Sequence, residues 1–185
     1  MLKVFLFSFI FLVSPFGFSQ GETEKKVLNY INQVRTNPQK FLEEIAKPYI
    51  KEKELDNNRY ARSLIRELTK LTPRDSLSFD PKLQLMAEKF REEAGRKGIL
   101  DHVRIKQRFD QYAPHVEITG ENLQFGFDQA LDIVMDLLID EDIPDAGHRR
   151  NILDSDFSVI GIAVGTHKTY DFMTVMEFGG FSEDN

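Results

Sequence analysis

Four histidines are the side chains of this 185-residue chain best suited to bind a metal or move a proton: His102, His115, His148 and His167. The chain has no cysteine, so thiol nucleophiles and thiolate ligands are excluded. It also has no HExxH, GxSxG or GxxxxGK[ST] motif. Because neutral imidazole binds Zn²⁺ well, two histidines that meet in one cleft beside an acid would form a site.

His148 lies in the stretch DAGHRRNIL, residues 145–153. If Asp145 caps a short helix there, His148 falls in its first turn, where the helix dipole disfavours imidazolium. Gly147 would let the backbone approach a cleft. The stretch therefore predicts a neutral, metal-ready ring. The two arginines that follow are expected to pair with nearby acids; these charged residues are Arg149, Arg150, Asp142 and Asp145.

His115 and His167 are interpreted as structural, since His167 falls in a predicted hairpin turn, where polar residues are favoured. A row of acids also recurs at every fourth position. We interpret this row as a solvated helix face, because like charges at that spacing repel and no EF-hand loop accompanies them. Its members are Asp128, Asp132, Asp136 and Asp140.

Hydrophobic periodicity predicts the elements that must position these side chains. Asn37–Pro38 and Asp80–Pro81 each combine a capping residue with proline at a first helical position. The first of these helices should stop near Lys47–Pro48, and the second near Gly98. Residues 101–115 suggest a mixed loop with one helical turn. Helices are expected over 24–36, 38–47, 59–71, 81–97 and 127–142, and strands over 115–126 and twice within 158–180. This order favours an α+β fold with an antiparallel sheet.

The first 19 residues have the order of a secretory signal peptide. Lys3 precedes an apolar run, and the small residues Gly17 and Ser19 stand before an expected cleavage site. Residues 20–185 are then one domain, secreted or periplasmic, with no membrane span in the mature chain. The net charge of −6 argues against a nucleic-acid partner.

Several segments together resemble the bacterial branch of the CAP superfamily, the SCP-like extracellular proteins related to cysteine-rich secretory proteins, venom antigens and plant pathogenesis-related proteins. The segments are VLNYINQVRTNP at 27–38, LSFDPKLQLMAEKFREEA at 77–94, GENLQFG at 120–126, GHRRNIL at 147–153 and VIGIAVG at 159–165. The resemblance leaves residues 38–76 as a helical insertion. It implies a three-layer α-β-α sandwich with a small antiparallel sheet and a cleft.

The resemblance implies that this cleft carries two histidines and two acids, and that it can hold a divalent metal such as Zn²⁺ weakly and reversibly. By position these are His102, Glu121 of the GEN motif, His148 of the GHR motif and Asp140. Asp140 is in register because Leu137 occupies the first position of the family's Trp-x-x-Glu pattern. The helical periodicity points Glu141 nearer the apolar face, so Glu141 remains the alternative second acid.

The resemblance favours a secreted binding module over an enzyme, with a cleft that recognises a lipid, a sterol or a cell-envelope partner. One alternative is a zinc-dependent hydrolase, in which His102 and His148 hold the metal and Glu121 is the general base. The other is a structural or interaction protein with no functional cleft.

Overall fold

The computed structural model describes residues 21–182, so the predicted signal peptide lies outside the described residues. No helix in this range is both long enough and apolar enough to cross a membrane. The helices are α1 Glu22–Thr36, α2 Pro38–Phe41, the π-helical η1 Leu42–Ala46, α3 Lys47–Glu52, α4 Arg59–Lys70, α5 Pro81–Lys97, α6 Ile105–Tyr112, α7 Ala130–Ile139 and α8 Gly147–Leu153. The strands are β1 Ser78–Phe79, β2 Ile118–Phe125, β3 Val159–His167 and β4 Asp171–Gly180.

The strands form one sheet in the order β1-β3-β4-β2, which makes β2 an edge strand. The β3–β4 hairpin and the β2–β4 pair are antiparallel, as the sequence predicts. The two-residue β1 differs, because it pairs with β3 in parallel.

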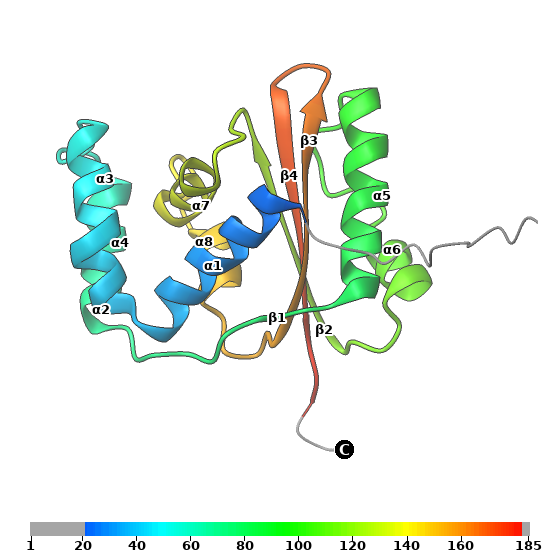
Figure 1. The fold of residues 1–185 in the computed structure, drawn as a ribbon, viewed down its shortest axis with the longest axis horizontal. Helices are drawn as coiled ribbons and strands as arrows, with labels where there is room; N and C mark the ends of the chain where they lie inside the picture. The colour runs from blue at the N-terminus through cyan, green and yellow to red at the C-terminus, as the bar shows by residue number, and fades with distance from the viewer. Residues whose placement is uncertain (1–20, 183–185) are drawn as a thin grey trace, which may run out of the picture.

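Helices cover both faces of the sheet, which confirms the predicted α-β-α sandwich (Figure 1). On one face, Ala87 and Phe90 of α5 pack on Val175 of β4. On the other face, Ile31 of α1 and Phe178 of β4 belong to a larger apolar core. The two cores lie on opposite sides of β4 because successive side chains of a strand point to opposite faces.

Helix α5 lies against β3 at backbone contact distance. A Cβ at Gly161 would come within 2.1 Å of the carbonyl carbon of Leu83. No side chain can be accommodated there, so glycine sets the spacing between this helix and the sheet.

The insertion, which contains α2, η1, α3 and α4, packs outside α1 and α7, away from the sheet (Figure 1). The predicted stop near Lys47–Pro48 is wrong, because helical structure continues to Glu52. Pro48 has no N–H to donate, and its ring would clash with a carbonyl four residues earlier. The wider turn of η1 precedes it, and the Lys47 N–H donates to the Leu42 carbonyl five residues back.

Two predicted helix ends are confirmed in α5. The Asp80 side chain accepts hydrogen bonds from the N–H groups of Lys82 and Leu83, and Gly98 ends the helix with φ of 74°. The expected mixed loop over 101–115 contains a longer helix than predicted, since α6 spans eight residues. This difference matters because α6 carries Arg108.

Candidate functional site

The candidate site is built around two consecutive residues of the edge strand β2, Glu121 and Asn122. Their side chains point to opposite faces of the sheet. The Glu121 carboxylate faces α5 and α6, where it contacts His102 and Arg108. The Asn122 amide faces α8 and donates to the His148 carbonyl oxygen at 2.9 Å. The two histidines are therefore attached to neighbouring positions of one strand, from its two sides.

His102 follows α5 and is held by Glu121. The ring Nδ1 lies 2.7 Å from Glu121 Oε1, and the ring is 44 % exposed while the Glu121 side chain is fully buried. This hydrogen bond to a carboxylate raises the pKa of His102 above its ordinary value of 6.5.

Arg108 of α6 joins Glu121 to a second buried acid, Glu177 of β4. Its guanidinium donates to Glu121 Oε2 and to Glu177 Oε1, each at 2.6 Å. The same guanidinium lies over the ring of Phe90, 3.7 Å from its centroid. The two acids are cross-strand partners in the β2–β4 ladder. Arg108 therefore fixes the orientation of Glu121, and through it the His102 ring.

Glu177 shares its buried surroundings with another carboxyl group. Burial, followed by the negative charge of Glu121, raises the pKa of Glu177 well above its ordinary value of 4.5. Its Oε2 is buried without a hydrogen-bond partner among residues 21–182. The Arg108 guanidinium thus lies between the Glu121 carboxylate and the Glu177 carboxyl group, and Glu177 favours its neutral form.

His148 lies at the second position of α8 and is held by Asp140. The ring Nδ1 lies 2.7 Å from Asp140 Oδ1, and Asp140 Oδ2 accepts the backbone N–H of His148 at 2.9 Å. The Asp140 side chain is 2 % exposed and that of His148 is 24 % exposed. Since a carboxylate only accepts, Nδ1 of each of the two site histidines carries a proton, and a neutral ring keeps its lone pair on Nε2.

Asp140 reaches His148 because α7 ends there. Asp140 is in the left-handed region with φ of 57°, which turns the chain back toward α8. Its carboxylate supplies the N-terminal cap of α8 that the sequence analysis assigns to Asp145. Asp145 instead pairs with Arg150 at 2.8 Å, so that part of the predicted charge pairing is present. Glu141, the alternative acid, accepts a hydrogen bond from Asn58 of the insertion.

Gly147 begins α8 and has room for a Cβ. A Cβ at this position would come no nearer than 3.7 Å to the Asp145 carboxylate. Close packing against protein atoms therefore does not require a glycine here, and the approach of its backbone to a cleft stays a prediction.

Arg149 does not pair with Asp142 or Asp145, contrary to expectation. It is 1 % exposed and points away from the site, into the insertion. Its guanidinium donates to the carbonyl of Ile139 at 2.9 Å and to the Ser63 hydroxyl of α4 at 3.0 Å. It also forms an ion pair with Glu67 at 3.1 Å. Arg149 thus connects α7, α8 and α4.

The acidic row is only partly a solvated face, because Asp136 is exposed whereas Asp140 is buried. Asp132 accepts from the Tyr49 hydroxyl at 2.8 Å and pairs with Lys53, both of the insertion. Asp136 accepts from Gln124 of β2 at 3.3 Å. With Asp140 on His148, three members of the row are bound by three different elements. These partners offset the like-charge repulsion.

The remaining two histidines have separate partners. His115 Nε2 lies 2.9 Å from Asp80 Oδ2, at the start of α5. His167 Nε2 donates to the Ile99 carbonyl, while its Nδ1 accepts the N–H groups of Thr169 and Tyr170 in the hairpin turn. Neither contact involves the residues of the candidate site.

The donor set limits what metal the site can hold. Within residues 21–182, no group of three or more histidine, aspartate or glutamate side chains is arranged to bind a metal ion. His102 and His148 each keep Nε2 as a possible donor, while their carboxylates are engaged on Nδ1. Each ring therefore keeps one nitrogen for an external ligand, and the side chains of residues 21–182 form no closed protein-held metal site.

A groove of about 250 Å³ lies between the insertion and the C-terminal end of α7. Tyr49 and Leu55 line one side, and Phe127 and Ile139 line the other. Glu141 also lines this groove, one residue from Asp140. Lys53 and Asp136 complete the lining, so the groove is part apolar and part charged, and Phe127 is 39 % exposed.

Sequence reasoning missed Arg108 and Glu177. The segment around Arg108 has few apolar residues, so its hydrophobic pattern shows no clear helical periodicity. Glu177 becomes visible only once the β2–β4 register places it opposite Glu121. An acid within a run of buried strand residues is the one signal that could have identified it, because charged side chains are rarely buried without a partner.

Comparison with protein-family models matches residues 28–178 to one described as the cysteine-rich secretory protein family, CAP. Comparison with curated protein sequences finds no match. Among solved structures, an outer surface protein from Borrelia burgdorferi is similar with a TM-score of 0.58 and 18 % identity, over 87 % of this chain and 94 % of that one. An SCP-domain extracellular protein from Bacillus anthracis has a TM-score of 0.48 and 17 % identity, over 65 % of this chain and 38 % of that one.

Proposed function

This chain belongs to the cysteine-rich secretory protein (CAP) family, and we propose that it is a secreted binding module whose His102–His148 cleft recognises an extracellular ligand. Reversible binding of a divalent metal by the two rings would tune that recognition. The observation that carries the proposal is the matched pair of histidine–acid contacts, His102 with Glu121 of β2 and His148 with Asp140 at the end of α7. Each histidine uses Nδ1 on a buried acid, at 2.7 Å in both cases, and keeps Nε2 for an external partner.

The acids make this arrangement suitable for a ligand. Carboxylates that hold Nδ1 fix the ring orientation and raise the basicity of the opposite nitrogen. Zn²⁺, when bound, would supply positive charge that attracts an oxygen of the ligand. The protein side chains hold the rings in place, and the exposure of His102 leaves its ring accessible.

The groove beside Glu141 supports a ligand with an apolar body, such as a lipid or a sterol. Ligand pockets are mostly apolar with a few polar groups that fix orientation. Phe127, Leu55 and Ile139 would supply the apolar contact, and the neighbouring Asp140–His148 pair the polar one. Membership of a family described as secretory supports export, together with the leader-like sequence of residues 1–19.

The contacts of Glu121 favour a binding module over a hydrolase. A general base must have a free oxygen that can take a proton from water. Glu121 Oε1 is bound to His102, and Oε2 is bound to Arg108 at 2.6 Å. Both oxygens are engaged, so Glu121 is placed to orient His102.

Zinc titration by calorimetry tests the metal-binding part of the proposal. We expect His102→Ala and His148→Ala each to weaken zinc binding at least about tenfold, since each removes one of two imidazole ligands. His115→Ala is the matched control, because His115 contacts Asp80 elsewhere. Equal affinity in all four proteins would refute a shared metal site.

A lipid-binding assay tests the ligand class. We expect the protein to retain a fatty acid or cholesterol probe, and Phe127→Ser to reduce that retention. Phe181→Ser is the matched control, because Phe181 is an exposed aromatic residue outside the groove. A second arm assays ester and peptide hydrolysis with and without a chelator. Chelator-sensitive turnover that is lost in Glu121→Gln would replace the binding module with the hydrolase.

A further inference from the structure

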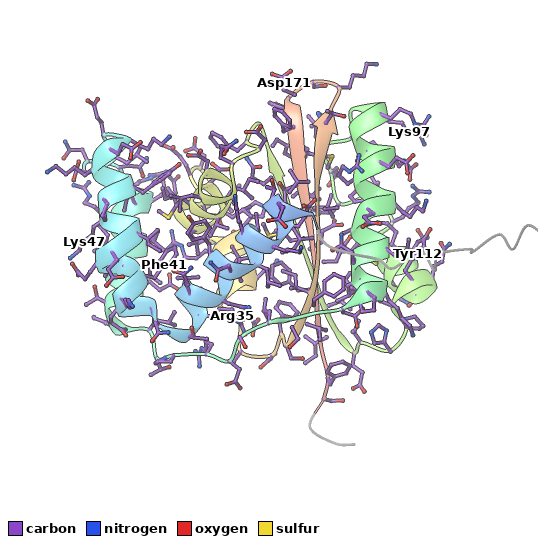
Figure 2. All side chains as sticks on the ribbon, viewed as in Figure 1. Arg35, Phe41, Lys47, Lys97, Tyr112 and Asp171 are labelled. Carbon is purple, nitrogen blue, oxygen red and sulfur yellow. The ribbon has the colours of Figure 1, made fainter. Side chains whose placement is uncertain are left out.

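A second hollow of about 380 Å³, here called the hairpin groove, lies between α5 and the β3–β4 hairpin. Three basic side chains line it, Arg91, Arg96 and Lys168, against one acid, Glu92. Figure 2 places this region at one end of the molecule, where Lys97 marks the end of α5 and Asp171 the hairpin. A basic groove is notable on a chain whose net charge is −6.

Arg91 is held in place by packing without being neutralised. A Cβ added to Gly165 would lie 2.7 Å from Arg91 Cδ and 2.9 Å from its Cζ, so the guanidinium lies directly on this glycine. Its Nε is buried and has no acceptor among residues 21–182. Arginine nitrogens that are buried are normally paired, because an unpaired buried charge is costly.

The three buried arginines follow that rule. The guanidinium of Arg35 donates to main-chain carbonyls, including that of Phe157 at 3.0 Å. Arg108 has two carboxylate partners, and Arg149 has Glu67. Arg91 and its neighbours Arg96 and Lys168 form no ion pair within the described part of the chain. Structural pairing therefore explains those three arginines but not Arg91.

The helix dipole does not explain the cluster either. Cations are favoured at a helix C-terminus, and this accounts for Arg96 in the last turn of α5. Arg91 lies more than a turn earlier. The carbonyl groups at the end of α5 are also already hydrogen-bonded. The Ala94 carbonyl accepts the N–H groups of Gly98 and Ile99, and the Gly95 carbonyl accepts the N–H of Lys168. The groove is therefore less negative than an uncapped helix end.

The groove wall is well ordered by hydrogen bonds. His167 uses both ring nitrogens within the hairpin turn, and the Lys168 N–H is bound to α5 at 2.9 Å. The Lys168 side chain is therefore anchored at its base, while the exposed Thr166 offers a hydroxyl. A preorganised set of cationic and hydroxyl donors is suited to a tetrahedral oxyanion.

We propose that the hairpin groove binds a phosphate group, with the Arg91 guanidinium and the Lys168 ammonium as its principal donors and the Thr166 hydroxyl as a third. The phosphate can be free in solution or carried by a lipid headgroup. This site is separate from the His102–His148 cleft and does not depend on it.

Titration of the ¹⁵N-labelled protein with inorganic phosphate tests the proposal. The Arg91 Nε–H and the Gly95 and Thr166 amides should shift in a saturable manner. Arg91→Gln should weaken binding about tenfold or more, as expected for loss of a charge-assisted hydrogen bond. Gly165→Ala should also weaken it, since the new Cβ displaces Arg91. Retained dispersion of the other amide signals shows that each variant is folded.

Lys40→Gln is the matched control, because Lys40 is an exposed cation of α2 in the insertion. In a parallel arm, vesicles of phosphatidylcholine with and without phosphatidic acid are sedimented with the protein. Binding of free phosphate supports a soluble source, and binding of phosphatidic acid vesicles alone supports a headgroup. The proposal fails if neither probe binds, or if Lys40→Gln weakens binding as much as Arg91→Gln.

Discussion

One carboxylate, that of Asp140, holds both the ring and the backbone of His148. Oδ1 lies 2.7 Å from the ring Nδ1, and Oδ2 lies 2.9 Å from the backbone nitrogen. The acid that orients the ring is thus also the acid that caps α8, so site geometry and helix stability depend on one side chain.

Asp140→Asn should therefore act in two ways. Loss of the negative charge at the start of α8 should lower the free energy of unfolding by about 0.3–1 kcal/mol. Zinc affinity should fall about 10–100-fold, because the partner that orients His148 is altered. Urea unfolding and calorimetry measure the two effects. Glu141→Gln is the control and should change neither, since Glu141 bonds to Asn58.

Arg108→Met should lower the free energy of unfolding by about 3–5 kcal/mol, because it leaves Glu121 and Glu177 buried without their shared cation. Adding Glu177→Gln to this variant should recover part of the loss. Arg104→Met removes an exposed ion pair with Glu93 and should cost less than about 1 kcal/mol. Equal losses in the Arg108 and Arg104 variants would contradict the buried network.

The raised pKa of Glu177 predicts a pH dependence of stability. Because folding raises this pKa above 4.5, the folded state binds the proton more tightly. The contribution of the protonated Glu177 carboxyl group to the stability of the fold is fully present below pH 4.5. It is lost as pH rises through the folded-state pKa. Glu177→Gln should remove this loss and be more stable than the wild type at neutral pH. Urea unfolding between about pH 4 and pH 8 measures the difference.

The pKa of His102 is also raised, but the cause is its hydrogen bond to Glu121, which favours the charged ring, whereas burial favours the neutral form of Glu177. The contribution of the His102–Glu121 bond is fully present below pH 6.5 and is lost as pH rises through the folded-state value. NMR titration of the ring should show a pKa above 6.5, and Glu121→Gln should lower it. A wild-type value at or below 6.5 would show that the 2.7 Å contact does not form in solution.

Gly161→Ala should destabilise the fold by at least about 3 kcal/mol, because its Cβ would meet the Leu83 backbone. Gly147→Ala makes the same chemical change where the nearest atom is 3.7 Å away. It should change the free energy of unfolding by less than about 1 kcal/mol. Thermal unfolding of the two variants compares the positions directly.

The sequence was sufficient for the elements whose signals are local. The Asp80–Pro81 cap, the Gly98 stop and the strands of the hairpin are set by neighbouring residues, and the α+β class follows from their order. The three-layer sandwich was implied by the family resemblance. Family motifs placed His102, Glu121, His148 and Asp140 on the chain. Their contacts could not be derived locally, because Arg108 and Glu177 meet Glu121 only through the packed sheet. The Pro48 prediction failed because a π turn is not specified by any short pattern.

The burial of Arg149 has a consequence for how this branch of the fold can be modified. Its guanidinium extends from the histidine motif into Ser63 and Glu67 of α4. Excising the extra helices would remove Ser63 and Glu67 from this guanidinium and would uncover the apolar faces of α1 and α7 that the insertion buries. In any chimaera, the insertion and the GHRRNIL segment must therefore be exchanged together.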